Sequence, residues 1–331
     1  MQSNSFLGFI LPRPGFFRPR HEDDSENQGT QALFMSCVIC DEPRYWRLPF
    51  AQNPDVTRWR AEAGDDAEYE WRLCRRCGNA YPSHQPRLAV LQRIWNASRS
   101  DDCLTTDAKD TAWSYRRAIS QVGATRSFRL FAPLAVDHPR RFIDIGCGLG
   151  ETVRIFADNG WDAEGVDADP STARFHRELG IRVRIGQLEQ TEATTEYDLI
   201  HIAHAIYFIT DPMAFIRGVR ARLRPGGLFC IVLADLMANT DPTLPSYVHT
   251  FFPTASSMRY ALSLAGFETI FCRRLSGSIF MAARPAPSVA RPFVSPVAIR
   301  MLYRTKSLRY ALFGRPYILL ARAIKSLLGR S

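Results

Sequence analysis

The segment Phe142-Ile143-Asp144-Ile145-Gly146-Cys147-Gly148-Leu149-Gly150-Glu151 is a short apolar run that breaks into three closely spaced glycines and then a helical pattern. This order predicts a strand, a tight turn and a helix, a common arrangement for binding a nucleotide. Glycine suits the turn because the backbone must bend sharply and approach a ligand without a Cβ. The spacing G-x-G-x-G differs from the G-x-G-x-x-G of dinucleotide-binding turns, and a buried turn without a ligand is the alternative.

A second acid follows where a β–α–β unit would place it. Residues 152–159 have helical spacing and stop at Gly160, and residues 163–167 then form a predicted strand that ends in Asp167. In a doubly wound sheet, an acid at the carboxyl end of strand two can accept hydrogen bonds from both ribose hydroxyls. Asp169 and the proline after it predict an N-cap and the first turn of the next helix.

With these residues in place, residues 141–283 resemble the S-adenosylmethionine (SAM) dependent methyltransferases of the seven-stranded Rossmann-like class. The resemblance implies an α/β fold built on a seven-stranded sheet. It also implies that the glycine turn meets the methionine part of SAM, that Asp167 meets the ribose and that Gln187 and Leu188 surround the adenine, although Gln187 replaces the family's usual Asp. The full set of expected cofactor contacts is Asp144, Gly146, Gly148, Asp167, Ala168, Gln187 and Leu188.

The rest of the domain fits the same resemblance. The turn Arg-Leu-Arg-Pro-Gly-Gly-Leu leads into an apolar run, as the family's turn into strand five does. The expected elements are strands at 181–185, 197–202 and 229–233, a helix at 256–264, and two last antiparallel strands at 266–271 and 278–283.

His204 and His249 are candidate bases. The loop after strand four is similar to the family's His-Val-Leu-Glu-His, where His204 matches while Tyr207 and Phe208 replace the acid and the second histidine. These replacements predict a more apolar cleft. Methyl transfer needs mostly positioning, and needs a base only when the acceptor must lose a proton. His249 lies in a segment that recognises substrate in similar enzymes, or it anchors the core.

Two Cys-x-x-Cys pairs lie near the N-terminus. Cys37, Cys40, Cys74 and Cys77 can present four thiolates from two tight turns, which predicts a structural Zn²⁺ site. Disulfides and unliganded core cysteines are the alternatives, and the absence of a secretory signal disfavours disulfides. The module resembles one that precedes the methyltransferase fold in bacterial sugar and natural-product methyltransferases.

The charge of the chain is concentrated at one end. Residues 1–125 hold 16 basic and 16 acidic side chains and residues 126–285 hold 17 of each, whereas residues 286–331 hold nine basic ones and no acid. A balanced domain makes a nucleic-acid partner unlikely, while the tail predicts contact with an anionic surface. Two amphipathic stretches, 297–312 and 316–328, suit a helix at a membrane interface, and docking on the protein's own surface is the alternative.

The sequence therefore predicts five parts. They are a disordered N-terminus (1–35), a zinc-binding module (36–86), a helical linker or cap (87–125), a methyltransferase domain (126–285) and a basic amphipathic tail (286–331). The helices of 87–125 lie over the cofactor cleft or serve only for packing.

The predicted function is SAM-dependent methyl transfer to a small-molecule, sugar or lipid-linked acceptor. We expect a cytoplasmic protein with peripheral contact at the inner face of the membrane. A zinc-knuckle ribosomal RNA methyltransferase is the alternative, and a non-catalytic protein that keeps the fold is a third hypothesis.

Overall fold

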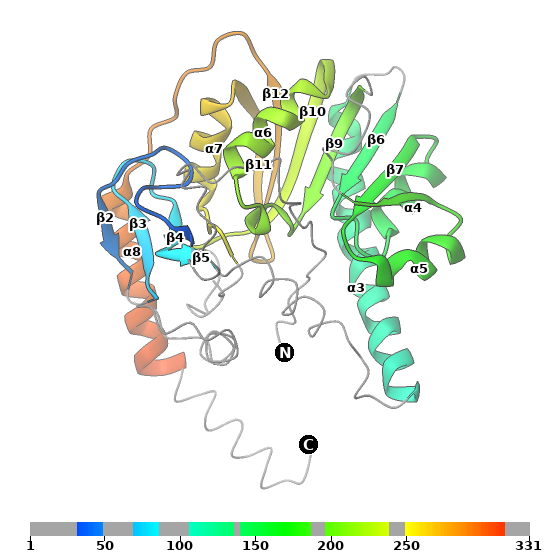
Figure 1. Ribbon diagram of the computed structural model, residues 1–331, viewed down its shortest axis with the longest axis horizontal. Coiled ribbons are helices and arrows are strands. Elements are labelled where there is room, and N and C mark those ends of the chain that lie inside the picture. Colours follow the sequence, from blue (N-terminus) through cyan, green and yellow to red (C-terminus); the bar gives the residue numbers. More distant parts are fainter. Residues whose placement is uncertain are drawn as a thin grey trace, which may run out of the picture.

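The computed structural model describes residues 32–48, 69–85, 106–135, 140–186, 196–237 and 249–314. A seven-stranded sheet in the order β11-β12-β10-β9-β6-β7-β8 forms its centre (Figure 1). β6, β7, β8, β9 and β10 run parallel, and β12 is antiparallel to both β10 and β11. The strands are β6 (Arg141–Ile145), β7 (Asp162–Asp167), β8 (Arg182–Ile185), β9 (Tyr197–Ala203), β10 (Leu223–Ala234), β11 (Phe267–Leu275) and β12 (Ser278–Pro285).

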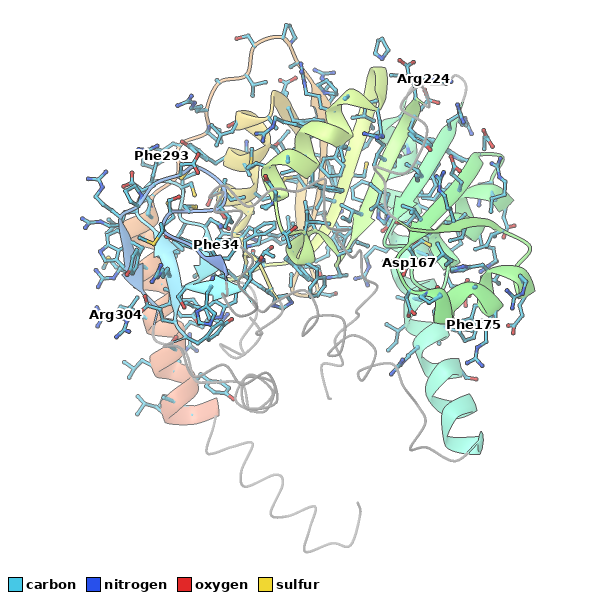
Figure 2. The ribbon with its side chains drawn as sticks, viewed as in Figure 1. Phe34, Asp167, Phe175, Arg224, Phe293 and Arg304 are labelled. Carbon is cyan, nitrogen blue, oxygen red and sulfur yellow. The ribbon has the colours of Figure 1, made fainter. Side chains whose placement is uncertain are left out.

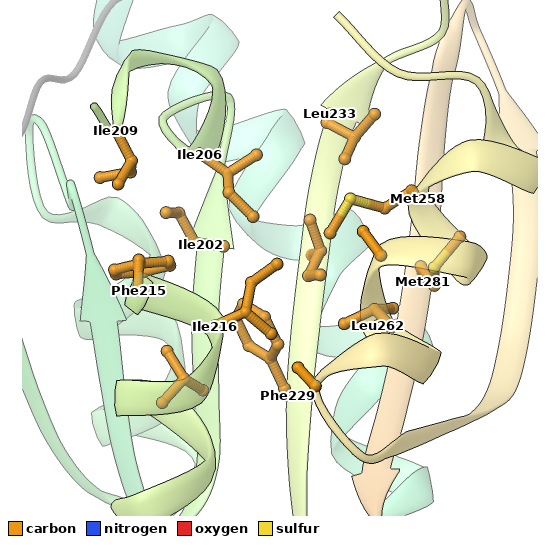
Figure 3. Close-up of a cluster of buried hydrophobic side chains, with 14 of the residues drawn as sticks. Ile202, Ile206, Ile209, Phe215, Ile216, Phe229, Leu233, Met258, Leu262 and Met281 are labelled. Atoms are coloured by element: carbon orange, nitrogen blue, oxygen red, sulfur yellow. The ribbon is translucent and has the colours of Figure 1, made fainter. Parts of the chain in front are cut away.

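Each face of this sheet has its own apolar cluster, because successive side chains of a strand point to opposite faces. Ile200 and Ile202 of β9 belong to one cluster, with α6 (Pro212–Ala221) and α7 (Ala255–Leu264) (Figure 3). Leu199 belongs to the other, with α3 (Thr106–Phe131) and α4 (Glu151–Asp158). Helices on both faces of a mostly parallel sheet are the predicted architecture.

Local signals fix where these helices begin. Asp211 caps α6 by accepting a hydrogen bond from the Ala214 amide at 2.8 Å. Thr254 and Ser257 form a capping box at the start of α7. A 3₁₀ turn (Ile206–Phe208) continues from the end of β9.

The cysteine module is a small antiparallel sheet of β2 (Tyr45–Arg47), β3 (Trp71–Cys74) and β4 (Ala80–Pro82). α8 (Pro296–Arg309), followed by a π turn (Tyr310–Gly314), packs against it through Ile299 and Tyr303. Ala80 pairs with Phe252 of the large domain. Cys37, Cys74 and Cys77 belong to the same buried cluster as the centre of the large sheet, so module and domain share a core.

Three local features differ from what the sequence predicts. β1 (Ala32–Leu33) lies within the N-terminus predicted to be disordered, because its backbone pairs with β5 (His84–Gln85). α3 crosses the boundary set at residue 125, because Ala124, Ser127 and Phe131 recur at helical spacing and are buried against the sheet.

The third concerns the helix predicted to begin after Asp169, whose first turn is a 3₁₀ turn. A 3₁₀ turn (Pro170–Thr172) precedes α5 (Ala173–Glu178), and Thr172 donates both its amide and its hydroxyl to the Asp169 carbonyl oxygen. No helix within the described ranges is long and apolar enough to cross a membrane.

Candidate functional site

The Asp167 carboxylate holds the glycine turn in place. β7 ends at Asp167 beside the end of β6, so the acid is next to the turn that follows β6. Its Oδ2 accepts a hydrogen bond from the Gly148 amide at 2.7 Å, and its Oδ1 accepts one from the Asp169 amide at 2.9 Å. The side chain is fully buried, and it lies at the carboxyl edge of the sheet, whereas Arg224 marks the opposite edge (Figure 2).

Gly148 exposes backbone at the tip of this turn. Its φ of +56° is in the left-handed region, and a Cβ built on it would meet no atom within 4 Å. The open space therefore lies where a ligand can reach bare backbone. The Gly148 carbonyl oxygen is 2.8 Å from Nε2 of His176, a buried residue of α5, so side chains contact both backbone polar groups of Gly148.

Asp144 lies one layer below the turn in a buried chain of polar groups. Its Oδ1 is 2.7 Å from Nδ1 of His201 on β9, and Nε2 of His201 is 3.2 Å from the Ser127 hydroxyl on α3. All three side chains are buried. Asp144 was predicted as a cofactor contact, and the structure shows that it ties β6 to β9 and α3 beneath the turn.

α3 is fastened to the same region by an ion pair. Arg117 of α3 is 3.4 Å from Glu151, the buried first residue of α4, and 3.9 Å from Glu178 at the end of α5. Phe128 of α3 packs edge-on against Phe156 of α4, with ring centroids 5.0 Å apart. α3 thus contacts both α4, which follows the glycine turn, and α5, which follows Asp167.

His204 and His249 come together around Tyr207. Nδ1 of His204 is 3.1 Å from the Tyr207 hydroxyl, and the His249 ring packs edge-on against the Tyr207 ring at 4.8 Å. His204 directly follows β9 and has φ of +54°, an unusual value for a residue with a Cβ. The Thr250 hydroxyl donates to the carbonyl oxygen of Tyr207 or Ile209, which lie at 3.0 and 2.7 Å.

Burial keeps both histidines neutral near pH 7. It lowers the pKa of His204 to about 4, with a smaller contribution from the nearby His201, and it lowers the pKa of His249 to about 3. Burial also raises the pKa of Tyr207 well above its usual value, so its hydroxyl stays protonated. The group offers neutral donors and acceptors in an apolar setting, at the same edge of the sheet as the glycine turn.

The sequence reasoning missed His201, Ser127 and His176. Each contacts the turn or its support across a long sequence separation, and no local motif marks it; the only signal for His201 was a polar residue inside an otherwise apolar strand. Gly146 lies at the turn and Ala168 directly follows Asp167, and their contact with a cofactor stays a prediction. Gln187 and Leu188 fall outside the described residues.

The four knuckle cysteines converge. Sγ of Cys37 is 3.6 Å from that of Cys77, Sγ of Cys40 is 3.5 Å from that of Cys74, and all four lie within 4.8 Å of one another. A tetrahedral Zn²⁺ with bonds of about 2.3 Å separates its sulfurs by about 3.8 Å, so these residues fit the ion.

Hydrogen bonds around the knuckles suit thiolates. The amides of Arg76 and Cys77 donate to Sγ of Cys74 at 3.3 and 3.4 Å. Hydrogen bonds from Cys37 and the other knuckle thiols lower the pKa of Cys74, whereas burial raises the pKa of Cys37. The pKa values of Cys74 and Cys37 are thus shifted in opposite directions. A bound divalent cation would favour the thiolate at all four positions.

Comparison with known proteins agrees with this geometry. The family model described as "Methyltransferase domain" matches residues 113–270, from α3 into β11. This segment is a methyltransferase domain. It includes the glycine turn, Asp167, His204 and His249, whereas the four cysteines and α8 lie outside it.

Curated relatives of this chain include ubiquinone biosynthesis O-methyltransferases. The protein from Bordetella avium is 31% identical over 147 residues, which is 37% of this chain and 61% of the relative. The protein from Parvibaculum lavamentivorans is 40% identical over 100 residues, 28% of this chain and 39% of the relative. The chain thus spans about two fifths to three fifths of their lengths. The CcbJ methyltransferase of Streptomyces caelestis is similar with a TM-score of 0.42 and 16% identity, over 50% of this chain and 89% of that one.

Proposed function

We propose that this protein is a SAM-dependent methyltransferase acting on a small-molecule acceptor. The observation that carries the proposal is the Asp167 carboxylate at the carboxyl end of β7, which orients the Gly148 amide of the adjoining glycine turn. Such a turn offers backbone to the methionine part of a bound SAM, and the acid lies where ribose hydroxyls are recognised in sheets of this kind. The methyltransferase domain and its curated relatives support the same activity.

The buried, mostly apolar residues 206–209 after β9 favour an apolar or lipid-linked acceptor over a polynucleotide. SAM supplies an electrophilic methyl group, and the chain mainly has to hold the acceptor in line with it. Ile206, Tyr207, Phe208 and Ile209, which follow His204 in the chain, are all buried. We propose that neutral His204 accepts the proton of an attacking hydroxyl; the O-methyltransferase names of the relatives support an oxygen acceptor.

Calorimetry with SAM tests the central claim. Well-folded protein should bind SAM, and Asp167→Ala should weaken that binding by about 1–3 kcal/mol, the scale of lost hydrogen bonds to a charged group. The absence of any SAM binding to folded protein would refute the function.

The base is tested separately. His204→Gln should lower kcat in an assay with radiolabelled SAM and lipid or small-molecule fractions, while SAM affinity stays unchanged. An unchanged kcat would remove His204 as the base and leave methyl transfer standing. Methylation of ribosomal RNA alone would favour the alternative, against which the balanced charge of residues 126–285 counts.

A further inference from the structure

Among the residues that the structure describes, exposed large apolar side chains are concentrated on α8 and the segments beside it. Eleven large apolar residues are exposed among those the structure describes, and seven of them fall within residues 293–313. They are Phe293, Val297, Met301, Leu302, Leu308, Leu312 and Phe313. Scattered exposed apolar residues need no explanation, but a contiguous group marks an interaction surface.

α8 has apolar side chains on two opposite faces. One face packs on the cysteine module through Ile299 and Tyr303, which are buried. The helical period places Val297, Met301 and Leu308 on the opposite face, and Leu312 of the π turn continues the same row. Their exposed fractions are 54, 65, 59 and 58%. We call these four residues the outer stripe.

The inner face is held firmly, so the outer stripe is a fixed feature of the surface. A Cβ on Gly78, next to the second knuckle, would lie 2.4 Å from Cδ1 of Ile299, which shows how closely helix and knuckle approach. The guanidinium groups of Arg75 and Arg300 lie 5.0 and 4.9 Å from the centroid of the Trp46 ring. Nζ of Lys306 donates to the Leu236 carbonyl oxygen at 2.9 Å, which also ties the helix to the large domain.

Positive charge borders the outer stripe. Arg304 and Arg309 are exposed, and the helical period places them on either side of the outer stripe. Figure 2 shows Arg304 on the outer side of the module. Residues 286–331 contain no acid. From this geometry we infer that the outer stripe docks the enzyme on an anionic lipid surface, with its four apolar side chains entering the interface and its arginines meeting lipid phosphates.

Two other occupants fit less well. A second copy of this helix would bring like charges together around the stripe, which disfavours association. Single-stranded RNA is held by basic grooves with aromatic side chains for stacking, whereas the stripe is aliphatic. A lipid interface accepts aliphatic side chains and cations together.

Vesicle co-sedimentation tests the inference. The full chain should pellet with phosphatidylcholine vesicles that contain phosphatidylglycerol, should pellet less with phosphatidylcholine alone, and should be released as salt is raised. Arg304→Gln with Arg309→Gln should weaken binding about 25-fold, at about five-fold per cation near the surface. Met301→Gln with Leu308→Gln should weaken it by about ten-fold or more, because both side chains lose burial in the interface.

Matched control variants lie elsewhere on the surface. Val122→Gln on α3 and Arg217→Gln on α6 change an exposed apolar and an exposed basic residue outside the stripe, and they should leave vesicle binding unchanged. Circular dichroism of every variant checks that the fold is kept, as expected for exposed positions. Equal binding of stripe and control variants would overturn the inference.

Two further results would also overturn it. One is salt-sensitive binding to RNA without vesicle binding. The other is a dimer that the stripe variants abolish while the wild-type chain ignores vesicles. The inference is independent of the proposed reaction, since vesicle binding is measured without SAM.

Discussion

Individual side chains hold the glycine turn in shape, and we propose that the same turn recognises SAM. Asp167 accepts hydrogen bonds from two backbone amides, and His176 contacts the Gly148 carbonyl oxygen, so side chains of the protein itself hold the turn in shape. Groups that are organised in advance avoid the entropic cost of ordering on binding. Variants of this turn must therefore be separated into those that disturb the fold and those that disturb the ligand.

Gly148→Ala makes that separation, with Gly160→Ala as its control. Both glycines have positive φ, at +56° and +82°, and a Cβ on either would meet no atom within 4 Å. Each alanine should therefore cost about 1–2 kcal/mol of stability through backbone strain. Only Gly148→Ala should also weaken SAM binding, since its methyl group enters the space above the turn. Calorimetry and denaturant unfolding measure the two effects, and equal SAM affinities would show that the ligand lies elsewhere.

The neutral histidines should make stability depend on pH. The folded pKa values, about 4 for His204 and about 3 for His249, lie below the unfolded value of about 6.5. The unfolded chain therefore binds more protons between these values. The contribution of the two histidines to stability is fully present above about pH 6.5 and is lost as the pH is lowered toward 4. Each histidine should contribute a slope of up to about 1.4 kcal/mol per pH unit. Urea unfolding from pH 7.5 to 4.5 should show that His249→Gln has a shallower slope than wild type; identical slopes would contradict the assignment.

Among the elements, those set by local signals were predicted best. The glycine turn, Gly160 and the antiparallel last strands are written in short stretches of sequence, and the structure has them where expected. The two Cys-x-x-Cys pairs likewise identified four thiols that converge. A short motif carries this information because all its residues act within one turn.

Elements that depend on distant partners were predicted poorly. β1 has only two residues and exists because β5 lies beside it. The extent of α3 depends on its packing against the sheet near Phe131, which no spacing between residues 87 and 125 shows. His201 reads as one polar residue in an apolar strand until β6 places Asp144 next to it. The amphipathic pattern of α8 gave two alternatives, and the structure shows a helix docked on the protein's own surface that keeps a second apolar face exposed.

At the scale of the whole molecule, the cysteine module and the methyltransferase domain form one buried core. Cys37, Cys74 and Cys77 lie in the same apolar cluster as Ile202 and Phe229 of the large sheet. The division into separate domains that the sequence suggests is therefore not a division of the core. Loss of order at the knuckles should reach the sheet.

Zinc removal is therefore predicted to destabilise the entire protein. The purified chain should contain about one Zn²⁺, and chelation or Cys74→Ser should lower the melting temperature of the large sheet as well as that of the module. A loss of about 3 kcal/mol corresponds to about 4 °C for cooperative unfolding of a chain of this length. Hydrogen exchange of β9 and β10 amides reports on the sheet.

Cys272→Ser is the matched control for this experiment, because Cys272 is exposed and lies outside the knuckles. It should leave both zinc content and melting temperature unchanged. Protein that lacks zinc and keeps wild-type exchange rates in β9 and β10 would contradict the shared core.

The packing of Ile299 and Tyr303 on the cysteine module also bears on how the chain folds during its synthesis. The module is translated early, yet Ile299 and Tyr303, which share a buried cluster with Trp71, Leu73 and Ala80, belong to α8, near the other end of the sequence. Translation at about 5–20 residues per second leaves roughly 10–45 s between Gly78 and Tyr303. During that interval the module has an uncovered apolar face on the ribosome. A nascent chain that stops before α8 should therefore depend more on chaperones than one that includes it.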